Sequence, residues 1–200
     1  MDTKKERTLI VIKPDGIQRG LIGEVIGRYE KVGLKLVGVK MLVPSPEFVE
    51  KHYLIDPEWP FKTGSKAIES YKRQGKTPPS EDPLEVIKAI LNNLKKYLSS
   101  GPVVAMVWQG MHAVKIVRKI TGSTEPLSSD VGTIRGDYTI DSYEVSDIDG
   151  RSIRNILHSS GSPEEAEKEI ALWFPEGGLV DYRLITDAML YDVNLDGIME

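Results

Sequence analysis

Residues 9–16 read Leu-Ile-Val-Ile-Lys-Pro-Asp-Gly, an uninterrupted apolar run that stops at a turn signal. β-Branched apolar side chains favour a strand. Proline and glycine favour the turn, because proline presets φ and glycine accepts the left-handed region. A short apolar run between turn signals is typical of a strand inside a sheet. We therefore expect residues 9–12 to form an inner strand, with Lys13 in the loop where it ends.

Hydrophobic periodicity on the carboxyl-terminal side of this strand predicts an α/β fold. Strands are expected at 36–43, 103–108 and 153–158, and helices at 21–29 and 111–120. A last helix has clear start signals, since Ser162 suits the N-cap, Pro163 the first position, and Glu165 a capping box. Strands interleaved with helices in this order predict a sandwich with helices on one face of a small sheet.

Two stretches look like insertions into this plan. Residues 55–98 are punctuated by proline and glycine before an amphipathic helix for which Asp82 is the expected N-cap. The apolar stripe of that helix is Leu84, Ile87, Leu91, Leu94 and Leu98. Such a stripe has to be buried, which predicts a helical pair with the segment around Ile68. Residues 141–151 are polar and predict a loop. We expect a single domain over residues 1–200.

Composition excludes several classes of function. A net charge of -4 and a pI near 5.5 argue against stable nucleic-acid binding, which needs basic surface. The chain has no cysteine, which excludes disulfides, thiolate catalysis and thiolate metal sites. No segment is apolar for long enough to cross a bilayer, and the amino terminus is charged. We expect a cytoplasmic protein with no membrane partner.

The segment Asn155-Ile-Leu-His-Ser-Ser-Gly-Ser162 places His158 between a strand and a helix amino terminus. Backbone N–H groups and the helix dipole favour a phosphate there. Glu169 lies at the edge of the helix's apolar stripe, where it could turn inward, hold one imidazole nitrogen and leave the other free to attack. Glu169 also belongs to a charged run that suits a solvated face, and periodicity alone favours that reading.

Cations suited to phosphate occur at three separate places. Lys13 ends a strand, and Arg135 lies in Gly132-Thr-Ile-Arg-Gly-Asp137, where two glycines allow close backbone approach. Each of these, like Arg118, is singly more typical of a surface cation. Phosphoryl transfer needs several cations that converge on one site.

Five ordered motifs resemble the nucleoside diphosphate kinase family. They are E-R-T-L-I-V-I-K-P-D-G-I-Q-R-G at 6–20, S-G-P-V-V-A-M-V-W at 100–108, G-T-I-R-G-D at 132–137, N-x-x-H at 155–158, and A-E-K-E-I-x-L-W-F at 166–174. The resemblance implies a ferredoxin-like α/β sandwich with a four-stranded antiparallel sheet and flanking helices, to which the predicted helical hairpin at 55–98 is an insertion. It also implies transfer of the terminal phosphate of a nucleoside triphosphate to a nucleoside diphosphate by a ping-pong mechanism.

The same resemblance implies roles for individual residues. His158 would be the phosphorylated nucleophile and Glu169 its hydrogen-bond partner. The phosphates would be held by Lys13, Tyr53, Arg118, Thr124 and Arg135. Lys13 and Asn155 would also reach the sugar hydroxyl, and Mg²⁺ would bridge the phosphates. A homo-oligomer is implied, with a hexamer favoured. An unperturbed histidine would lose activity as the pH falls through about 6.5, unless Glu169 moves its pKa.

This chain departs from the family at two points. The family usually has H-G-S-D-S where residues 158–162 read H-S-S-G-S, so Ser159 and Gly161 replace a glycine and an aspartate. The loss at Gly161 puts in doubt any metal-water or subunit contact that the aspartate makes. Family members also connect Tyr53 to the strand that begins near Ser100 by a shorter segment, and that segment contains an aromatic residue that stacks on the base. In this longer connection the aromatic residue cannot be assigned, and Trp59 and Phe61 are the candidates.

Other functions remain to be weighed. One alternative is a non-catalytic nucleotide-binding or regulatory protein on the same fold. P-loop and dinucleotide motifs do not occur in the sequence. Asp192-Val-Asn-Leu-Asp-Gly197 matches half of an EF-hand loop, and we interpret it as a polar tail. The three histidines are scattered, so we expect no metal-binding cluster among them.

Overall fold

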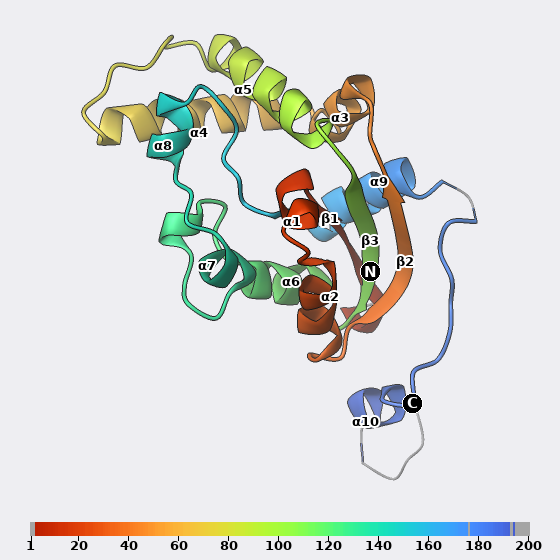
Figure 1. Ribbon diagram of the computed structural model, residues 1–200. Helices are drawn as coiled ribbons and strands as arrows, with labels where there is room; N and C mark the ends of the chain where they lie inside the picture. The colour runs from red at the N-terminus through yellow and green to blue at the C-terminus, as the bar shows by residue number, and fades with distance from the viewer. Residues whose placement is uncertain (1–2, 176, 193, 195–200) are drawn as a thin grey trace.

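A central four-stranded antiparallel sheet organises the fold in the computed structural model, which describes residues 3–175, 177–192 and 194 (Figure 1). Its strands, in the spatial order β2-β3-β1-β4, are β1 (Glu6–Ile12), β2 (Lys35–Leu42), β3 (Val103–Gly110) and β4 (Leu157–Ser159). The predicted inner strand is confirmed, since β1 lies between β3 and β4 and residues 9–12 are fully buried. Val11 pairs with His158, so β1 positions the segment that carries this histidine.

Helices cover both faces of the sheet, so the prediction of helices on one face is wrong. On one face, β1 side chains such as Ile10 join a core with α2 (Ile22–Glu30), α6 (Ala113–Thr121) and α7 (Ile134–Tyr138). On the other, Leu9 and Val11 join a core with α3 (Pro46–Tyr53), α5 (Pro83–Leu98) and α9 (Pro163–Trp173). Successive strand residues point to opposite faces, and β1 is apolar at consecutive positions. Both faces therefore need an apolar cover.

Several predicted boundaries are corrected by the structure. The turn after β1 contains a short helix, α1 (Pro14–Gln18), and residues 153–156 are not part of β4. The inserted loop at 141–151 contains α8 (Tyr143–Ile148), which begins where Ser142 Oγ accepts a hydrogen bond from Val145 N. A capping serine can start a helix that has too few apolar residues to show a periodicity.

Short elements complete the described chain. They are two 3₁₀ turns at Thr3–Lys5 and Pro126–Ser128, and a last helix, α10 (Asp187–Tyr191). The segment proposed as a half EF-hand loop lies largely outside the described residues. Among the residues that the structure describes, no helix is both long and apolar enough to span a bilayer.

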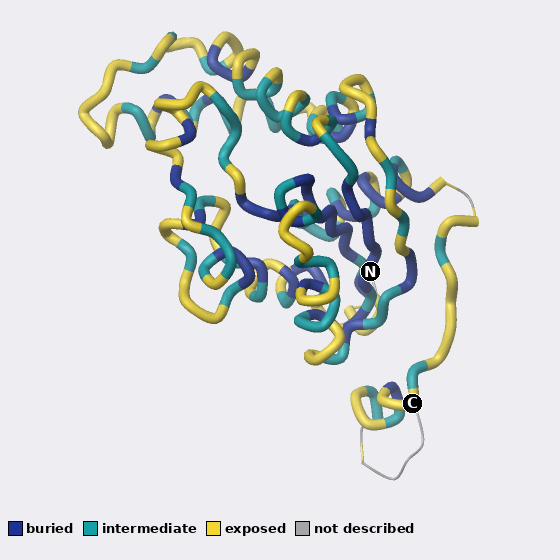
Figure 2. The backbone as a smooth tube through the Cα atoms, in the orientation of Figure 1, coloured by how far each residue is buried: buried dark blue, intermediate teal, exposed yellow. Residues whose placement is uncertain are grey.

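The predicted helical pair is present as α4 (Trp59–Arg73) and α5, which pack against each other at one end of the sheet (Figure 1). Ile87 and Leu98 of the predicted stripe are buried, but Leu84 is 50% exposed because it lies in the first turn of α5. The two helices approach closely at Gly64, since a Cβ atom there would lie 2.2 Å from the backbone oxygen of Pro83. Figure 2 shows that the connection between the two helices is exposed, whereas β1 and β3 are buried.

A methyl group at Gly64 tests how tightly the pair is packed. Gly64→Ala should lower the free energy of unfolding by about 1–3 kcal/mol, because the new Cβ atom meets backbone that cannot rotate away. Gly27→Ala in α2 is the matched control, since nothing lies within 4 Å of its Cβ position. It should raise stability by roughly 0.5–1 kcal/mol through helix propensity. Urea unfolding of both variants measures the difference, and a stabilised Gly64→Ala protein would contradict this packing.

Candidate active site

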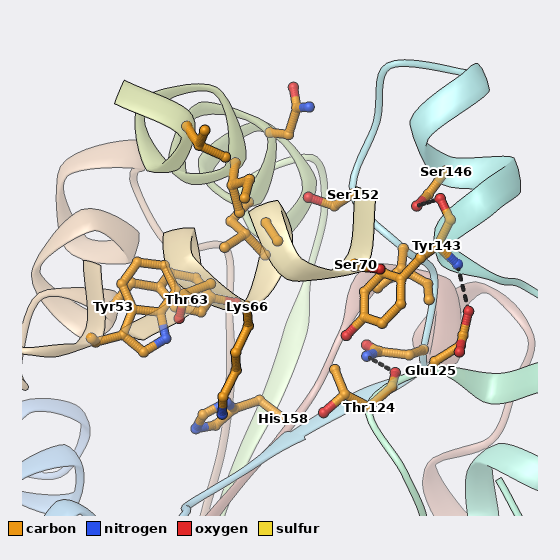
Figure 3. Close-up of a pocket in the computed structure, with 18 of the residues that line it drawn as sticks. Tyr53, Thr63, Lys66, Ser70, Thr124, Glu125, Tyr143, Ser146, Ser152 and His158 are labelled. Atoms are coloured by element: carbon orange, nitrogen blue, oxygen red, sulfur yellow. Dashed lines mark hydrogen bonds between the residues drawn. The ribbon is translucent and has the colours of Figure 1, made fainter. Parts of the chain in front are cut away.

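A cavity of about 1100 Å³ lies between the end of β4, the α4–α5 pair and α8. Figure 3 shows part of its lining, with His158 at one end and Ser146 on α8 at the other. All the residues expected in a phosphate site line this one cavity: Lys13, Tyr53, Arg118, Thr124, Arg135, Asn155, His158 and Glu169. The fold therefore brings together cations that the sequence left at separate places.

A strained turn precedes His158 and determines where it points. Ile156 has φ of 70°, and Leu157 N donates to Asn155 O at 2.8 Å, which closes a γ-turn. Positive φ is rare for a β-branched residue, and this kind of γ-turn is strained. The turn is held by Lys13 N, which donates to Ile156 O at 2.7 Å. This geometry explains why β4 is shorter than predicted.

His158 is oriented by a chain of hydrogen bonds that reaches β1. Its Nε2 lies 2.7 Å from Glu169 Oε1, and Ser160 Oγ donates to Glu169 Oε2 at 2.6 Å. Leu9 N in turn donates to Ser160 Oγ at 3.0 Å. Since a carboxylate only accepts hydrogen bonds, Nε2 of His158 carries the proton and Nδ1 keeps its lone pair. Glu169 is 2% exposed, so it turns inward, against what periodicity favoured.

His52 is a neighbour of the site that sequence reasoning missed. It lies in α3, is 3% exposed, and packs edge-to-face with His158 at 4.5 Å between ring centroids. Trp173 Nε1 donates to His52 Nδ1 at 3.2 Å, which places the proton of a neutral His52 on Nε2. Helical spacing showed only that His52 belongs to a helix, and no sequence signal linked it to a strand 106 positions away in chain order.

Two histidines and a carboxylate thus meet, although the histidines look scattered in the sequence. The ligand atoms of His52, His158 and Glu169 lie within 4.8 Å of one another, close enough to share a metal ion. Two of the atoms that could bind a metal are already engaged, because Glu169 Oε1 accepts from His158 and His52 Nδ1 accepts from Trp173. The two rings pack edge-to-face, and Nδ1 of His158 keeps its lone pair.

Burial keeps both rings neutral at physiological pH. It lowers the pKa of His158 to about 3, helped by the positive charge of Lys13, and it lowers the pKa of His52 to about 3 as well. The expected loss of the neutral form near pH 6.5 is therefore corrected to a much lower pH. A neutral imidazole has the free lone pair that nucleophilic attack requires.

Lys13 is a buried cation at the end of β1. Its Nζ donates to Asn155 Oδ1 at 2.7 Å, and the residue is 5% exposed. Burial, followed by repulsion from Arg135, lowers the pKa of Lys13 to about 7. A bound phosphate would restore this charge, because an anion nearby favours the ammonium form.

Arg135 serves mainly to hold the backbone around the cavity. Its guanidinium donates to Asn155 O at 3.1 Å, Leu157 O at 2.6 Å, Gly122 O at 3.2 Å and Ser123 O at 3.0 Å. These four bonds use four of the five N–H donors that arginine offers, which leaves one for a ligand. Arg135 thus has a structural role that the sequence did not predict, and its binding of phosphate remains a prediction.

The inserted helix α4 forms a wall of the cavity. Trp59 lines it and packs on Tyr53, with ring centroids 5.2 Å apart, whereas Phe61 is 59% exposed and is not among the lining residues. Figure 3 shows the side chain of Lys66 running from α4 toward His158, a cation that the sequence analysis did not consider. Of the two aromatic candidates, Trp59 is the one that faces the cavity. Base stacking by either remains a prediction.

Imidazole nitrogen NMR spectra recorded from pH 8 to pH 5 test the two lowered pKa values. His52 and His158 should stay neutral throughout, with the proton of both rings on Nε2. The histidine rings of the unfolded chain take up protons below about pH 6.5, whereas the two folded rings do not. The free energy of unfolding should therefore decrease as the pH is lowered through that range. A midpoint near 6.5 for either buried ring would contradict this description of the site.

Comparison with known proteins agrees with the fold and identifies the family. A sequence model described as nucleoside diphosphate kinase matches residues 6–77 and 83–179. A nucleoside diphosphate kinase of Pyrobaculum aerophilum is 47% identical over 175 residues, covering 86% of this chain and 96% of that protein.

Solved structures give the same result. The crystal structure of an NDP kinase from Pyrobaculum aerophilum has a TM-score of 0.85 at 45% identity, over 88% of this chain and 100% of that one. A transition-state mimic of the Borrelia burgdorferi enzyme with bound vanadate and ADP has a TM-score of 0.77 at 35% identity, over 95% and 99%. The chain therefore belongs to the nucleoside diphosphate kinase family, and transfer of a terminal phosphate between nucleotides is its reaction.

Proposed function

We propose that Nδ1 of His158 carries the phosphate between the donor and the acceptor nucleotide. The observation that carries this proposal is the bond from His158 Nε2 to buried Glu169, which leaves Nδ1 as the nitrogen with a lone pair. Nδ1 attacks the terminal phosphorus, the bond from that phosphorus to the bridging oxygen breaks, and the nucleoside diphosphate leaves. A terminal oxygen of the acceptor diphosphate then attacks the phosphohistidine, and Nδ1 regains its lone pair.

Glu169 contributes most once the phosphate is attached. The imidazole gains positive character when Nδ1 bonds to phosphorus, and a carboxylate 2.7 Å from Nε2 stabilises that charge. Glu169 is itself held by Ser160, so the ring need not reorient during the reaction. Pre-orientation of this kind lowers the barrier without new contacts at the moment of transfer.

Three cations neutralise the transferred group. Lys13, Arg118 and Arg135 line the cavity together with the hydroxyl of Tyr53 and with Thr124. In phosphoryl transfer, positioning and charge neutralisation account for most of the catalysis. Among the described residues the side chain of Arg118 has no hydrogen-bond or ion-pair partner, so its guanidinium is available to a phosphate.

Magnesium is the metal that we expect with the nucleotide. Mg²⁺ prefers oxygen ligands and keeps several waters, and the carboxylates of Glu125 and Glu165 on the cavity wall suit such a hydrated ion. When bound, the ion would offset the negative charge of the phosphates. A non-catalytic nucleotide-binding role is disfavoured, because it would leave the His158–Glu169 pair without a purpose.

Intact-mass measurement after incubation with ATP and Mg²⁺ tests the nucleophile. The protein should gain one phosphoryl group, which a nucleoside diphosphate then removes. His158→Ala should gain none and should lose turnover by a factor on the order of 10⁴ or more. His112→Asn is the control, since His112 is exposed and has φ of 49°, a conformation that asparagine accepts. A His158→Ala protein within tenfold of wild-type activity would refute the proposal.

We further propose a homo-oligomer, with a hexamer favoured. Family resemblance suggests it, and two exposed apolar groups support a subunit contact. The loop at 122–133 exposes Leu127 and Val131, and the edge strand β2 with the residue after it exposes Val39, Met41 and Val43. Exposed apolar patches are typical of protein contacts.

Sedimentation of the wild type at micromolar concentration should show an oligomer. Val131→Asp should shift it toward smaller species, because a charge would be buried in the contact. Ile185→Asp is the control, since Ile185 and Val131 are each 94% exposed. A wild-type monomer, or equal behaviour of the two variants, would exclude a contact through this loop.

A further inference from the structure

Glu165 occupies the space next to the glycine that replaces the usual aspartate. Its Oε2 accepts a hydrogen bond from Gly161 N at 2.9 Å, and it would lie 2.5 Å from a Cβ atom at position 161. The expected capping box would instead bond Glu165 to the N–H of Ser162. A one-residue shift of this bond turns the carboxylate toward the space beside residue 161.

The carboxylate faces the part of the cavity that binds phosphate. Glu165 lines the cavity with His158 and Arg118, and the Cβ position of Gly161 lies 3.9 Å from Arg118 Nη1. In the described part of the chain, Glu165 Oε1 has no hydrogen-bond partner. A negative group among phosphate-binding cations weakens phosphate binding, unless a positive ion accompanies the phosphate.

We propose that Glu165 is a specificity residue of this site, which favours the magnesium complex of a nucleoside diphosphate over the free diphosphate. The inference rests on the proposed function, because it assumes that the phosphates lie between His158 and Arg118. Glu165 repels an uncomplexed diphosphate. With the magnesium complex it meets a hydrated cation, which donates hydrogen bonds through its waters. Glu165 thus contributes to selection rather than to the transfer itself.

Calorimetric titration of unphosphorylated protein with ADP, in EDTA and in excess Mg²⁺, measures this selection without turnover. The test is run at pH 8, far above the ordinary pKa of a carboxyl group, because burial and the nearby Glu169 raise the pKa of Glu165. Glu165→Gln keeps an oxygen for Gly161 N and removes the charge. It should lower the ratio of the Kd of free ADP to the Kd of MgADP by about three- to tenfold, mainly through tighter binding of free ADP.

Two variants separate the charge from the structure. Glu164→Gln removes a charge from the same first turn of α9 at an exposed position, and should leave the ratio unchanged. The double variant Glu165→Ser, Gly161→Asp places a carboxylate in the same space again. It should restore the preference for MgADP over free ADP. A ratio unchanged by Glu165→Gln, or a parallel loss of both affinities, would overturn the inference. A wild type that binds no nucleotide would instead overturn the proposed function.

Discussion

The site depends on the hydrogen bonds that the buried guanidinium of Arg135 donates to backbone carbonyls. Its donors bond the carbonyls on both sides of Ile156 and the carbonyls of the loop that begins at Gly122. The γ-turn at Ile156 costs about 1–3 kcal/mol. Hydrogen bonds from a charged group contribute roughly 1.5–3 kcal/mol each, enough to hold such a turn. These bonds therefore hold the turn through which the chain enters β4, and Glu169 then orients the ring of His158.

The same burial sets the electrostatics of the cavity. His158 stays neutral because it is buried beside cations, and Lys13 gives up its proton more readily for the same reason. Glu169 is buried as well, and its two oxygens accept from a ring nitrogen and a hydroxyl. An anion bound beside Lys13 would restore its charge. We therefore expect phosphate binding to be linked to uptake of a proton by this lysine.

The helices α4 and α5 contribute more to the wall of the cavity than to the core around the sheet. α4 and α5 pack on each other, and α4 supplies the wall that contains Trp59 and Lys66. α8, from the second insertion, lies opposite, as Figure 3 shows. The sheet and its two layers of helices position His158, whereas the insertions enclose the cavity beside it.

Local sequence determined the elements whose cause is local. Three elements could be predicted from their own residues, because a strand, a cap and a helix depend on neighbours along the chain. They are the strand at 9–12, the helix start at Ser162 and the amphipathic helix α5. The ordered motifs also identified the family, and with it the antiparallel sheet and the candidate residues that meet in the cavity.

Tertiary structure decided what depends on distant contacts. The short β4 follows from the γ-turn that Arg135 holds, and the inward turn of Glu169 follows from the position of His158 on the neighbouring strand. His52 joins the site because α3 packs on the sheet next to Trp173. Hydrophobic periodicity indicates which side of a helix or strand is apolar. It does not record which residues of other elements that side meets, since pairing across the sheet sets those distances.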